Sequence, residues 1–324
     1  MRLVVVGYGV QGKKRVRVGG DDVVSVVDPV ADVAQYPTID RVPLDSFDAA
    51  AVCTPDAAKA EILRYLLGHG KHVLVEKPLL TSSPDELDHI RALSEKTGTV
   101  VYTAYNHRFE PHLQNVKELL ETDFTGRLYQ VSMFYGNGTA RNVRESPWRD
   151  HGMGVIADLA SHLLDLSSFF VDSHQIPPNK LELWVQDRFE NQASDYFLIG
   201  FPDVRPMIRL EGSLLSWRNR FTVDITAEDG SIHIDGLCKW GPASLTTRTR
   251  KLPSGKPDET VFTLEEADQS WVREYDEFKM LCGRGETAVT RLGGRRFERD
   301  VWINNIMHQM ASQIGVAVIP TVQT

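Results

Sequence analysis

The chain has 324 residues, of which 42% are hydrophobic and 25% charged, a composition typical of a globular enzyme long enough for two domains. Its formal net charge of −8 argues against nucleic acid or an anionic membrane as the main partner, because either partner favours a basic surface. The three cysteines are isolated and lack CxxC spacing, so we predict neither a disulfide framework nor a bound metal.

Predicted strands and helices alternate over the first hundred residues. The strands are Leu3–Val6, Val23–Val27, Ala49–Cys53, Val73–Val75 and Val100–Thr103. The helices are Gln11–Val18, Ala57–Gly68 and Asp85–Thr97, and a glycine stands at or soon after each helix end, as expected of a helix C-terminus. This alternation predicts a parallel sheet covered by helices on both faces.

From about Arg127 the pattern changes to strands in which polar and apolar residues alternate. The predicted strands are Arg127–Tyr135, Lys180–Gln186, Tyr196–Phe201, Met207–Leu215, Phe221–Ala227, Ser231–Ile234, Leu245–Arg250 and Thr260–Leu264. Helices are predicted at Val155–Phe170 and Asp300–Ile314, and a hairpin turn at Glu228-Asp229-Gly230. Alternation is typical of antiparallel sheets with one buried face. We therefore expect an α/β Rossmann domain at residues 1–106 and an α+β domain with a large, mostly antiparallel sheet at residues 107–324.

A glycine motif follows the first strand and reads Gly7-Tyr8-Gly9-Val10-Gln11-Gly12. In this pattern the first glycine allows a tight turn, the second lets a pyrophosphate approach the backbone, and the third lets helix and strand pack closely. The pyrophosphate sits at the helix N-terminus, where free N–H groups and the helix dipole favour negative charge. The position of the motif after a strand and before a helix predicts dinucleotide binding rather than a simple turn.

Asp28 ends the second predicted strand, where a carboxylate can bind the adenosine ribose hydroxyls. It would also repel a 2′-phosphate, so we predict NAD as the cofactor in preference to NADP. A basic run, Lys13-Lys14-Arg15 with Arg17, complicates this choice. These side chains could bind a pyrophosphate or a 2′-phosphate, or they could form a solvated helix face.

Two further segments end predicted strands and so lie at the edge where open α/β sheets bind ligands. They are Cys53-Thr54-Pro55 and Glu76-Lys77-Pro78. A lysine held in such a crevice can exchange a proton with an alcohol. Lys77 could equally be a surface lysine in a loop.

Asp158 and His162 are four residues apart on one predicted helix, hence on one face. Histidine titrates in the range useful for proton transfer, and a nearby carboxylate can orient an imidazole. The pair could instead be a surface ion pair, or half of a metal site for which no third ligand is evident.

Together these residues resemble the Gfo/Idh/MocA family of sugar and polyol oxidoreductases, named for glucose–fructose oxidoreductase and inositol dehydrogenase. The resemblance covers the chain from end to end, in the family's order. It is carried by Gly7–Gly12, Asp28, Cys53-Thr54-Pro55, Gly70–Pro78, Tyr105-Asn106-His107-Arg108-Phe109, Trp148-Arg149-Asp150 and the Asp158/His162 helix.

The resemblance implies an NAD(P)-dependent dehydrogenase or reductase that acts on a secondary alcohol or ketone of a sugar, nucleotide-sugar or inositol. The isolated cysteines fit a reducing cytoplasm, so we expect a cytoplasmic location. It implies that Lys77 and His162 handle the hydroxyl proton and that Asp158 positions the substrate. The implied cofactor contacts are Gly7, Gly9, Val10, Gln11, Gly12, Asp28, Cys53, Thr54, Pro55, Glu76, Lys77, Asn106 and Trp148. The implied substrate contacts are Lys77, Tyr105, Arg108, Arg149, Asp158 and His162. The second domain would bind substrate and form a homodimer or homotetramer through its sheet.

Two alternatives stay open. One is a non-catalytic NAD- or sugar-sensing regulator on the same fold, and the other is a reductase of a non-sugar carbonyl or imine. The chain also departs from the family where only 23 residues separate Asp28 from Val52, with three prolines among them. Family members fit a helix, a strand and another helix there, so we expect a shortened connection and a more open adenine side of the site.

Overall fold

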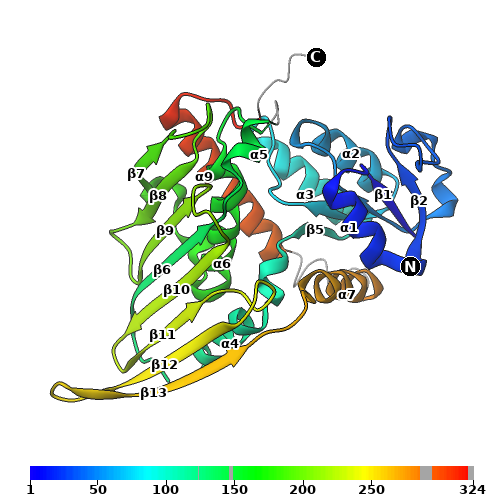
Figure 1. The fold of residues 1–324 in the computed structure, drawn as a ribbon. Coiled ribbons are helices and arrows are strands. Elements are labelled where there is room, and N and C mark those ends of the chain that lie inside the picture. Colours follow the sequence, from blue (N-terminus) through cyan, green and yellow to red (C-terminus); the bar gives the residue numbers. More distant parts are fainter. Residues whose placement is uncertain (123, 146–148, 285–293, 320–324) are drawn as a thin grey trace. The chain divides into compact units, whose positions relative to one another are not determined.

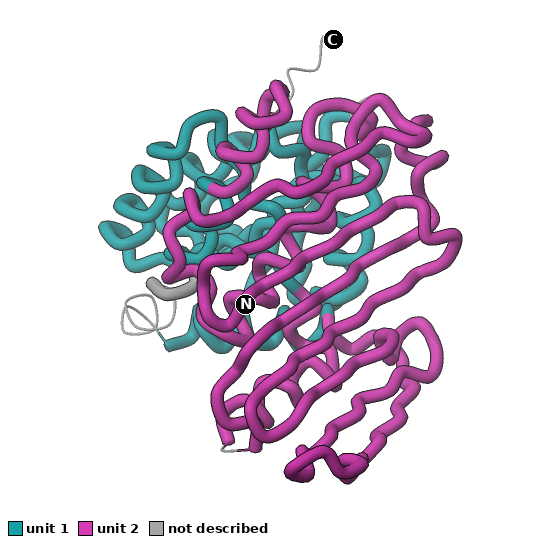
Figure 2. Tube along the Cα trace, turned by 90° about the vertical axis from the view of Figure 1, so that its left-hand side faces the viewer, with its two compact units in different colours: residues 1–105, 271–305 teal, residues 106–270, 306–324 magenta. Residues whose placement is uncertain are grey.

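The computed structural model describes residues 1–122, 124–145, 149–284 and 294–319. The chain divides into two compact units, coloured separately in Figure 2. Unit 1 consists of Met1–Tyr105 and Trp271–Asn305, and unit 2 of Asn106–Ser270 and Ile306–Thr324. Unit 1 is therefore built from two segments that lie far apart in the sequence.

Unit 1 contains a five-stranded parallel sheet in the order β2-β1-β3-β4-β5 (Figure 1). The strands are β1 (Leu3–Val6), β2 (Val23–Val27), β3 (Ala49–Val52), β4 (His72–Glu76) and β5 (Val101–Ala104). The helices between them are α1 (Val10–Gly19), α2 (Asp56–Gly68) and α3 (Asp85–Thr97). These elements confirm the predicted Rossmann-type sheet, with boundaries that shift by no more than one residue.

Helices cover both faces of this sheet, because its strands are apolar on both sides. Leu63 and Leu66 of α2 and Ile90 of α3 pack on one face, in a cluster that also contains Val4 and Val75. The other face packs against α7 (Ser270–Gly283), which the sequence analysis did not predict. The side chains that α7 contributes there are Tyr275, Phe278 and Leu281.

The connection between β2 and β3 is short, as expected. It contains only two 3-10 turns, η2 (Ile39–Arg41) and η3 (Leu44–Ser46), and no α-helix. Its start runs beside β2, since the Val26 N–H donates to the Gln35 side chain at 2.7 Å and the Asp28 N–H to the Tyr36 carbonyl at 3.1 Å. Within the described parts of the chain, β2 is consequently an edge strand of this sheet.

Unit 2 contains an eight-stranded sheet in the order β13-β12-β11-β10-β6-β9-β8-β7. Its strands are β6 (Leu128–Gly136), β7 (Glu182–Asp187), β8 (Tyr196–Phe201), β9 (Met207–Ser213), β10 (Arg220–Ala227), β11 (Gly230–Asp235), β12 (Ala243–Lys251) and β13 (Gly255–Leu264). Every neighbouring pair is antiparallel except β6 and β9. The mostly antiparallel sheet and the hairpin between β10 and β11 confirm the predictions.

Helices of unit 2 pack against one face of this sheet, where α6 (Ser161–Val171) contacts β6 and β9. The single helix predicted at Val155–Phe170 is two elements: a π-helix, η5 (Ile156–Ala160), leads into α6. Neither α4 (Pro111–Leu120) nor α5 (Ala140–Arg144) was predicted. The last helix, α9 (Gly294–Ile314), starts earlier than predicted and contributes to both units. The other 3-10 turns are η1 (Gly20–Asp22), η4 (Asn106–Phe109), η6 (Ser173–Gln175) and η7 (Pro178–Lys180).

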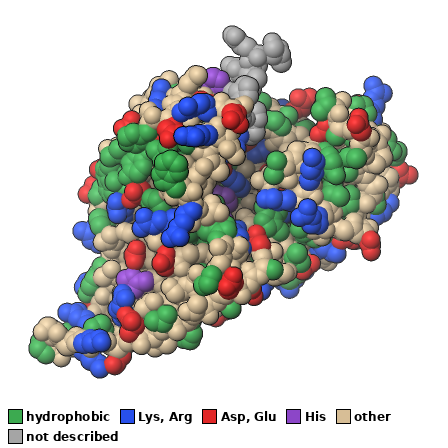
Figure 3. Space-filling model, viewed as in Figure 1, with side chains coloured by type: hydrophobic (Ala, Val, Ile, Leu, Met, Phe, Trp, Pro, Cys, Tyr) green, Lys and Arg blue, Asp and Glu red, His purple; other side chains and the backbone are tan. Residues whose placement is uncertain are grey.

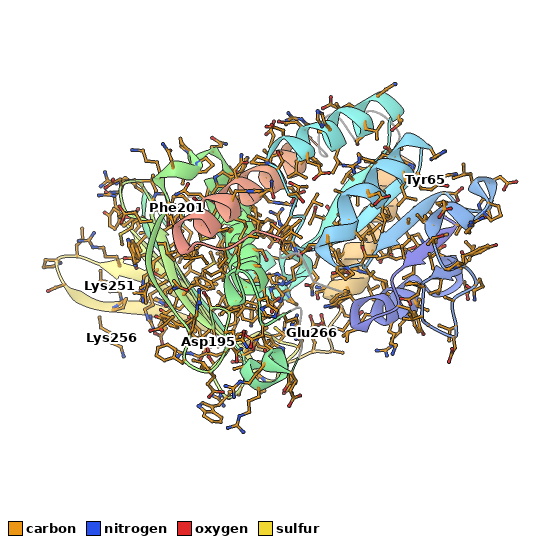
Figure 4. The ribbon with its side chains drawn as sticks, turned by 90° about the horizontal axis from the view of Figure 1, so that it is seen from above. Tyr65, Asp195, Phe201, Lys251, Lys256 and Glu266 are labelled. Carbon is orange, nitrogen blue, oxygen red and sulfur yellow. The ribbon has the colours of Figure 1, made fainter. Side chains whose placement is uncertain are left out.

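The hairpin of β12 and β13 carries mixed charge at its outer end (Figure 3). Figure 4 places Lys251 and Lys256 there. Lys251 pairs with Asp258 across the two strands at 2.5 Å, and Arg248 with Glu259 at 2.6 Å. Exposed ion pairs of this kind add little stability.

Among the described residues, no helix is both long and apolar enough to cross a membrane.

An ion pair next to β1 and β3 provides a test of the packing of unit 1. The Arg2 side chain and backbone N–H donate to the Asp48 carboxylate and lower its pKa from 3.8 to about 2. A lowered pKa in the folded state stabilises the fold above the unfolded pKa, and this stabilisation is lost as the pH falls from about 4 to about 2. Asp48→Asn should lower the urea midpoint near neutral pH, and the difference from the wild type should shrink as the pH falls from about 4 and vanish below about 2. Asp32→Asn, an equal charge change at an exposed turn, is the control, and a pH-independent deficit in Asp48→Asn would contradict this account.

Candidate active site

The glycine loop has the geometry that the motif requires. Gly7 has φ +90°, a conformation that side chains disfavour. A Cβ atom on Gly12 would lie 1.9 Å from the Gly7 carbonyl oxygen, so only glycine allows α1 to approach the turn this closely. A Cβ atom on Gly9 would meet no protein atom within 4 Å. Gly12 is therefore required by the fold, whereas nothing among the described residues explains Gly9.

The start of α1 offers unpaired donors to an anion. Gly9 is the N-cap, no side chain caps the helix, and its first turn contains no acidic residue. Two buried polar atoms have no hydrogen-bond partner among the described residues. They are Gln11 Oε1, in the first turn of α1, and Thr54 Oγ1, shortly after the end of β3. Open space at Gly9, a helix N-terminus without a side-chain cap and the Thr54 hydroxyl, which can donate a hydrogen bond, together fit a dinucleotide phosphate group. The Gln11 oxygen only accepts hydrogen bonds, so it fits a hydroxyl or amide N–H rather than the phosphate.

Asp28 is held against the glycine loop. Its carboxylate accepts hydrogen bonds from the N–H groups of Tyr8 at 2.7 Å, Val30 at 3.0 Å and Ala31 at 2.9 Å. The Tyr8 hydrogen bond is the main reason why the pKa of Asp28 lies below its ordinary value. A fixed negative charge beside the loop favours ribose hydroxyls over a 2′-phosphate, as predicted.

The basic run after the glycine motif does not form a single solvated face, because Arg15 is only 2% exposed. Its Nε atom lies 2.7 Å from Glu76 Oε1 and its Nη2 atom 2.7 Å from Glu274 Oε2. The Trp271 ring packs 4.3 Å from its guanidinium carbon. Arg15 is therefore committed to a buried ion network, and only the exposed Lys13, Lys14 and Arg17 side chains could reach a phosphate.

The predicted strand-end segments lie where expected within unit 1. Backbone atoms of Cys53 and Thr54 would be 2.9–3.2 Å from a Cβ atom on Gly7, so this segment borders the glycine loop. Burial raises the pKa of the Cys53 thiol far above its ordinary value, which keeps it protonated and unreactive. Pro55 is the N-cap of α2. Glu76 ends β4, and half-buried Lys77 follows it directly.

His162 is held in an aromatic cluster of unit 2. It is 7% exposed, so the surface ion-pair interpretation does not apply to it. Its ring centroid lies 4.2 Å from that of His107 and 5.9 Å from that of Tyr135. Burial raises the pKa of Tyr135, and the charge of Asp158 raises it further, so the phenol stays protonated. The cluster combines an imidazole, a second imidazole and a phenol, three groups that can bind or pass a proton.

Asp158 lies on the π-helix, a type of distortion that is frequent at functional sites. Its carboxylate pairs with Arg149 at 3.6 Å, and both side chains are partly exposed. The structure thus brings together two of the predicted substrate contacts. It also gives Asp158 and His162 different surroundings, because one is accessible to solvent and the other is packed among rings.

Other predicted contacts have structural partners. The Arg108 guanidinium binds Asp165, with Nε 2.7 Å from Oδ2, and the Asn106 side chain donates to Ser270 Oγ at 2.7 Å. The Tyr105 ring is buried in unit 1 and packs against the Arg299 guanidinium. Trp148 lies outside the described residues. A substrate role for Arg108, or a cofactor role for Asn106, would have to be shared with these contacts.

Three residues that contact candidate site residues or their backbone received no role from the sequence: Lys59, His107 and Tyr135. His107 lies in the segment Tyr105–Phe109, but nothing in its spacing indicated that its ring stacks on another. The Asp56/Lys59 spacing on α2 was the one local signal for Lys59, since a lysine three residues after an aspartate on an apolar helix face can be buried and paired.

Comparison with known proteins finds a family match for the first part of the chain. Residues 1–105 match the Gfo/Idh/MocA oxidoreductase family, described as having an NAD-binding Rossmann fold. The match covers about a third of the chain, its Rossmann part, and there it confirms the resemblance and, at family level, the NAD prediction.

The matches to individual proteins cover only part of their lengths. The chain aligns with between 36% and 44% of the length of the first curated relatives. A glucose-6-phosphate 3-dehydrogenase of Bacillus subtilis is 24% identical over 40% of this chain and 38% of its own length. An inositol 2-dehydrogenase of Rhizobium meliloti is 22% identical over 46% of this chain and 44% of its own.

Among solved structures, an inositol dehydrogenase homologue from Azotobacter vinelandii, complexed with NADH and myo-inositol, has a TM-score of 0.75. The alignment covers 97% of this chain and 96% of that one at 17% identity. At this identity the similarity concerns the fold, and it extends over both the parallel and the mostly antiparallel sheet.

Proposed function

We propose that this chain is an NAD-dependent oxidoreductase that transfers a hydride between nicotinamide and a secondary alcohol or ketone of a sugar, nucleotide-sugar or inositol. The observation that carries the proposal is the glycine loop of unit 1. There, a turn that only glycine allows, open space at Gly9 and a bare helix N-terminus coincide with the match to an NAD-binding family.

When bound, NAD supplies the carbon that accepts or donates the hydride. The chain supplies the rest. Backbone N–H groups at the start of α1 bind the pyrophosphate, and Asp28 binds the ribose. We assign the hydroxyl proton to Lys77 and His162, and substrate positioning to Asp158 and Arg149. The packing of His162 among rings supports this role, because a histidine with restricted rotation is ready to receive a proton.

The substrate class rests on relatives whose names include a sugar phosphate and inositols. Assembly into a homodimer or homotetramer through the large sheet stays a prediction from the resemblance. A cytoplasmic location stays a prediction from the isolated cysteines.

A substrate panel tests the proposal. Purified chain with NAD and either myo-inositol, glucose 6-phosphate, levoglucosan or a UDP-sugar should form NADH with at least one of them. NADH binding without turnover on any polyol or sugar would favour a sensing regulator. Turnover restricted to non-sugar carbonyls or imines would favour the second alternative.

Gly9 offers a separate test of the cofactor site. Gly9→Ala should fold like the wild type, because its Cβ meets no protein atom, yet it should weaken NADH binding by about tenfold or more, as the methyl group blocks the pyrophosphate. Gly68→Ala adds the same group at an equally open position in α2 and is the control. Fluorescence titration with NADH gives both affinities, and equal affinity in the two variants would place the dinucleotide elsewhere.

A further inference from the structure

Lys59 is a buried lysine of unit 1, in the first turn of α2. It lies on α2 and is only 2% exposed, although burying a charge is costly unless it is paired and hydrogen-bonded. Its Nζ atom donates to Asp56 Oδ1 at 2.6 Å, to the Glu76 carbonyl at 2.7 Å and to the Pro78 carbonyl at 2.8 Å. An ammonium group has three donors, so all of them are used.

The two carbonyl groups belong to the residues on either side of Lys77. A single ammonium group therefore binds the backbone immediately before and immediately after the lysine to which we assign the hydroxyl proton. The Glu76 side chain is held independently, since its carboxylate accepts a hydrogen bond from Arg15. The strand end is thus fixed through both backbone and side chain, while Lys77 itself stays half-buried.

We infer that Lys59 is a positioning residue: by binding the Glu76 and Pro78 carbonyls it fixes the backbone from which the Lys77 amine reaches the substrate. This inference rests on the proposed function for its catalytic consequence, but the anchoring itself does not. Misplacement of a reacting group by about 1 Å can lower a rate by about a hundredfold, so a loosened Lys77 should affect kcat.

The chain contains a matched control, Lys71. Its Nζ atom also donates to two backbone carbonyls, those of Leu44 at 2.6 Å and Phe47 at 2.8 Å. Lys59→Met and Lys71→Met therefore remove the same number of lysine-to-carbonyl hydrogen bonds, but only the first removes them around Lys77. In Lys59→Met the remaining Asp56 carboxylate is about one-third exposed, so it keeps access to water.

Hydrogen exchange measured by mass spectrometry tests the anchoring without a substrate. In Lys59→Met the peptide that contains Lys77 and Leu79 should exchange faster, while in Lys71→Met faster exchange should be confined to the segment around Leu44 and Phe47. Lys59→Gln, which can keep one of the two carbonyl hydrogen bonds, should give an intermediate rate. It also serves as the test protein if Lys59→Met does not fold.

Steady-state kinetics test the consequence, with the sugar or polyol that the wild type turns over. Lys59→Met should lower kcat by about 10- to 100-fold with little change in the KM for NAD, and Lys71→Met should stay within about twofold of the wild type. Unchanged exchange around Lys77, or equal kcat values in the two variants, would overturn the inference. A wild type without turnover would instead contradict the proposed function, and hydrogen exchange would still decide whether Lys59 anchors the Lys77 segment.

Discussion

Lys77→Ala is expected to lower kcat by about 10²- to 10⁴-fold, the usual contribution of a general acid or base, while the chain still folds and binds NADH. Lys77 follows β4 at the carboxyl end of the sheet, where open α/β sheets bind their ligands, and its side chain is only half-buried. Removing the Lys77 side chain should therefore impair proton transfer more than it disturbs packing. Initial rates of NADH formation give kcat, and fluorescence titration with NADH gives the affinity for the cofactor.

Lys96→Ala is the control, because it removes an exposed lysine from the last turn of α3 in the same unit. It should leave kcat and NADH affinity unchanged. If Lys77→Ala keeps its kcat within about twofold, the hydroxyl proton is handled elsewhere. If it loses NADH binding and turnover in parallel, Lys77 binds cofactor rather than transferring a proton.

The sequence was sufficient for most of the fold because the responsible signals are local. Strands such as β1 and β3 are continuous apolar runs, and α3 is followed by Gly98, whose left-handed φ of +65° favours glycine. In unit 2, alternation of buried and exposed residues along β10 shows directly which face packs. Such patterns depend on neighbours in the chain and can be interpreted without the structure.

The missed elements depend on distant partners. Helix α7 packs against the parallel sheet through Tyr275 and Phe278, more than 150 residues after the last strand of that sheet in the sequence. No local pattern indicates that Trp271–Asn305 returns to unit 1. The π-helix that carries Asp158 was missed for a related reason, because the apolar spacing of Val155–Phe170 also fits an ordinary helix.

The candidate site divides in the same way. The glycine loop, Asp28 and the strand ends were predictable, since their role follows from their place beside a strand. Residues that act through long-range contacts were not: Lys59 binds carbonyl groups about 20 residues away, and His107 stacks on a ring 55 positions later. The basic run was ambiguous in sequence because charge alone does not reveal that Arg15 has buried carboxylates as partners.

Arg15→Met is expected to destabilise the fold by about 3–5 kcal/mol, the cost of breaking a buried ion pair by removing one partner. Burial opposes the charge of Arg15, but the Glu76 and Glu274 carboxylates outweigh it and raise the pKa of the guanidinium above its ordinary value. Without Arg15, both buried carboxylates lose this cation, and the Trp271 ring loses the guanidinium that stacks on it and keeps only the Lys14 ammonium. Urea unfolding followed by circular dichroism measures the loss, with Arg17→Met, an exposed arginine on the same helix, expected within about 0.5 kcal/mol of the wild type.

The pH dependence of this variant separates charge from packing. A carboxylate that has lost its cation is costly only while it is ionised, so acidification should recover part of the stability of Arg15→Met relative to the wild type. Combining Arg15→Met with Glu76→Gln and Glu274→Gln should recover part of the stability near neutral pH as well, because a buried neutral amide costs less free energy than a buried carboxylate without its cation. If neither change helps, the stacking of Arg15 on Trp271, rather than its charge, holds α7 against the Rossmann sheet. The same variant would then show less protection of α7 from hydrogen exchange at every pH.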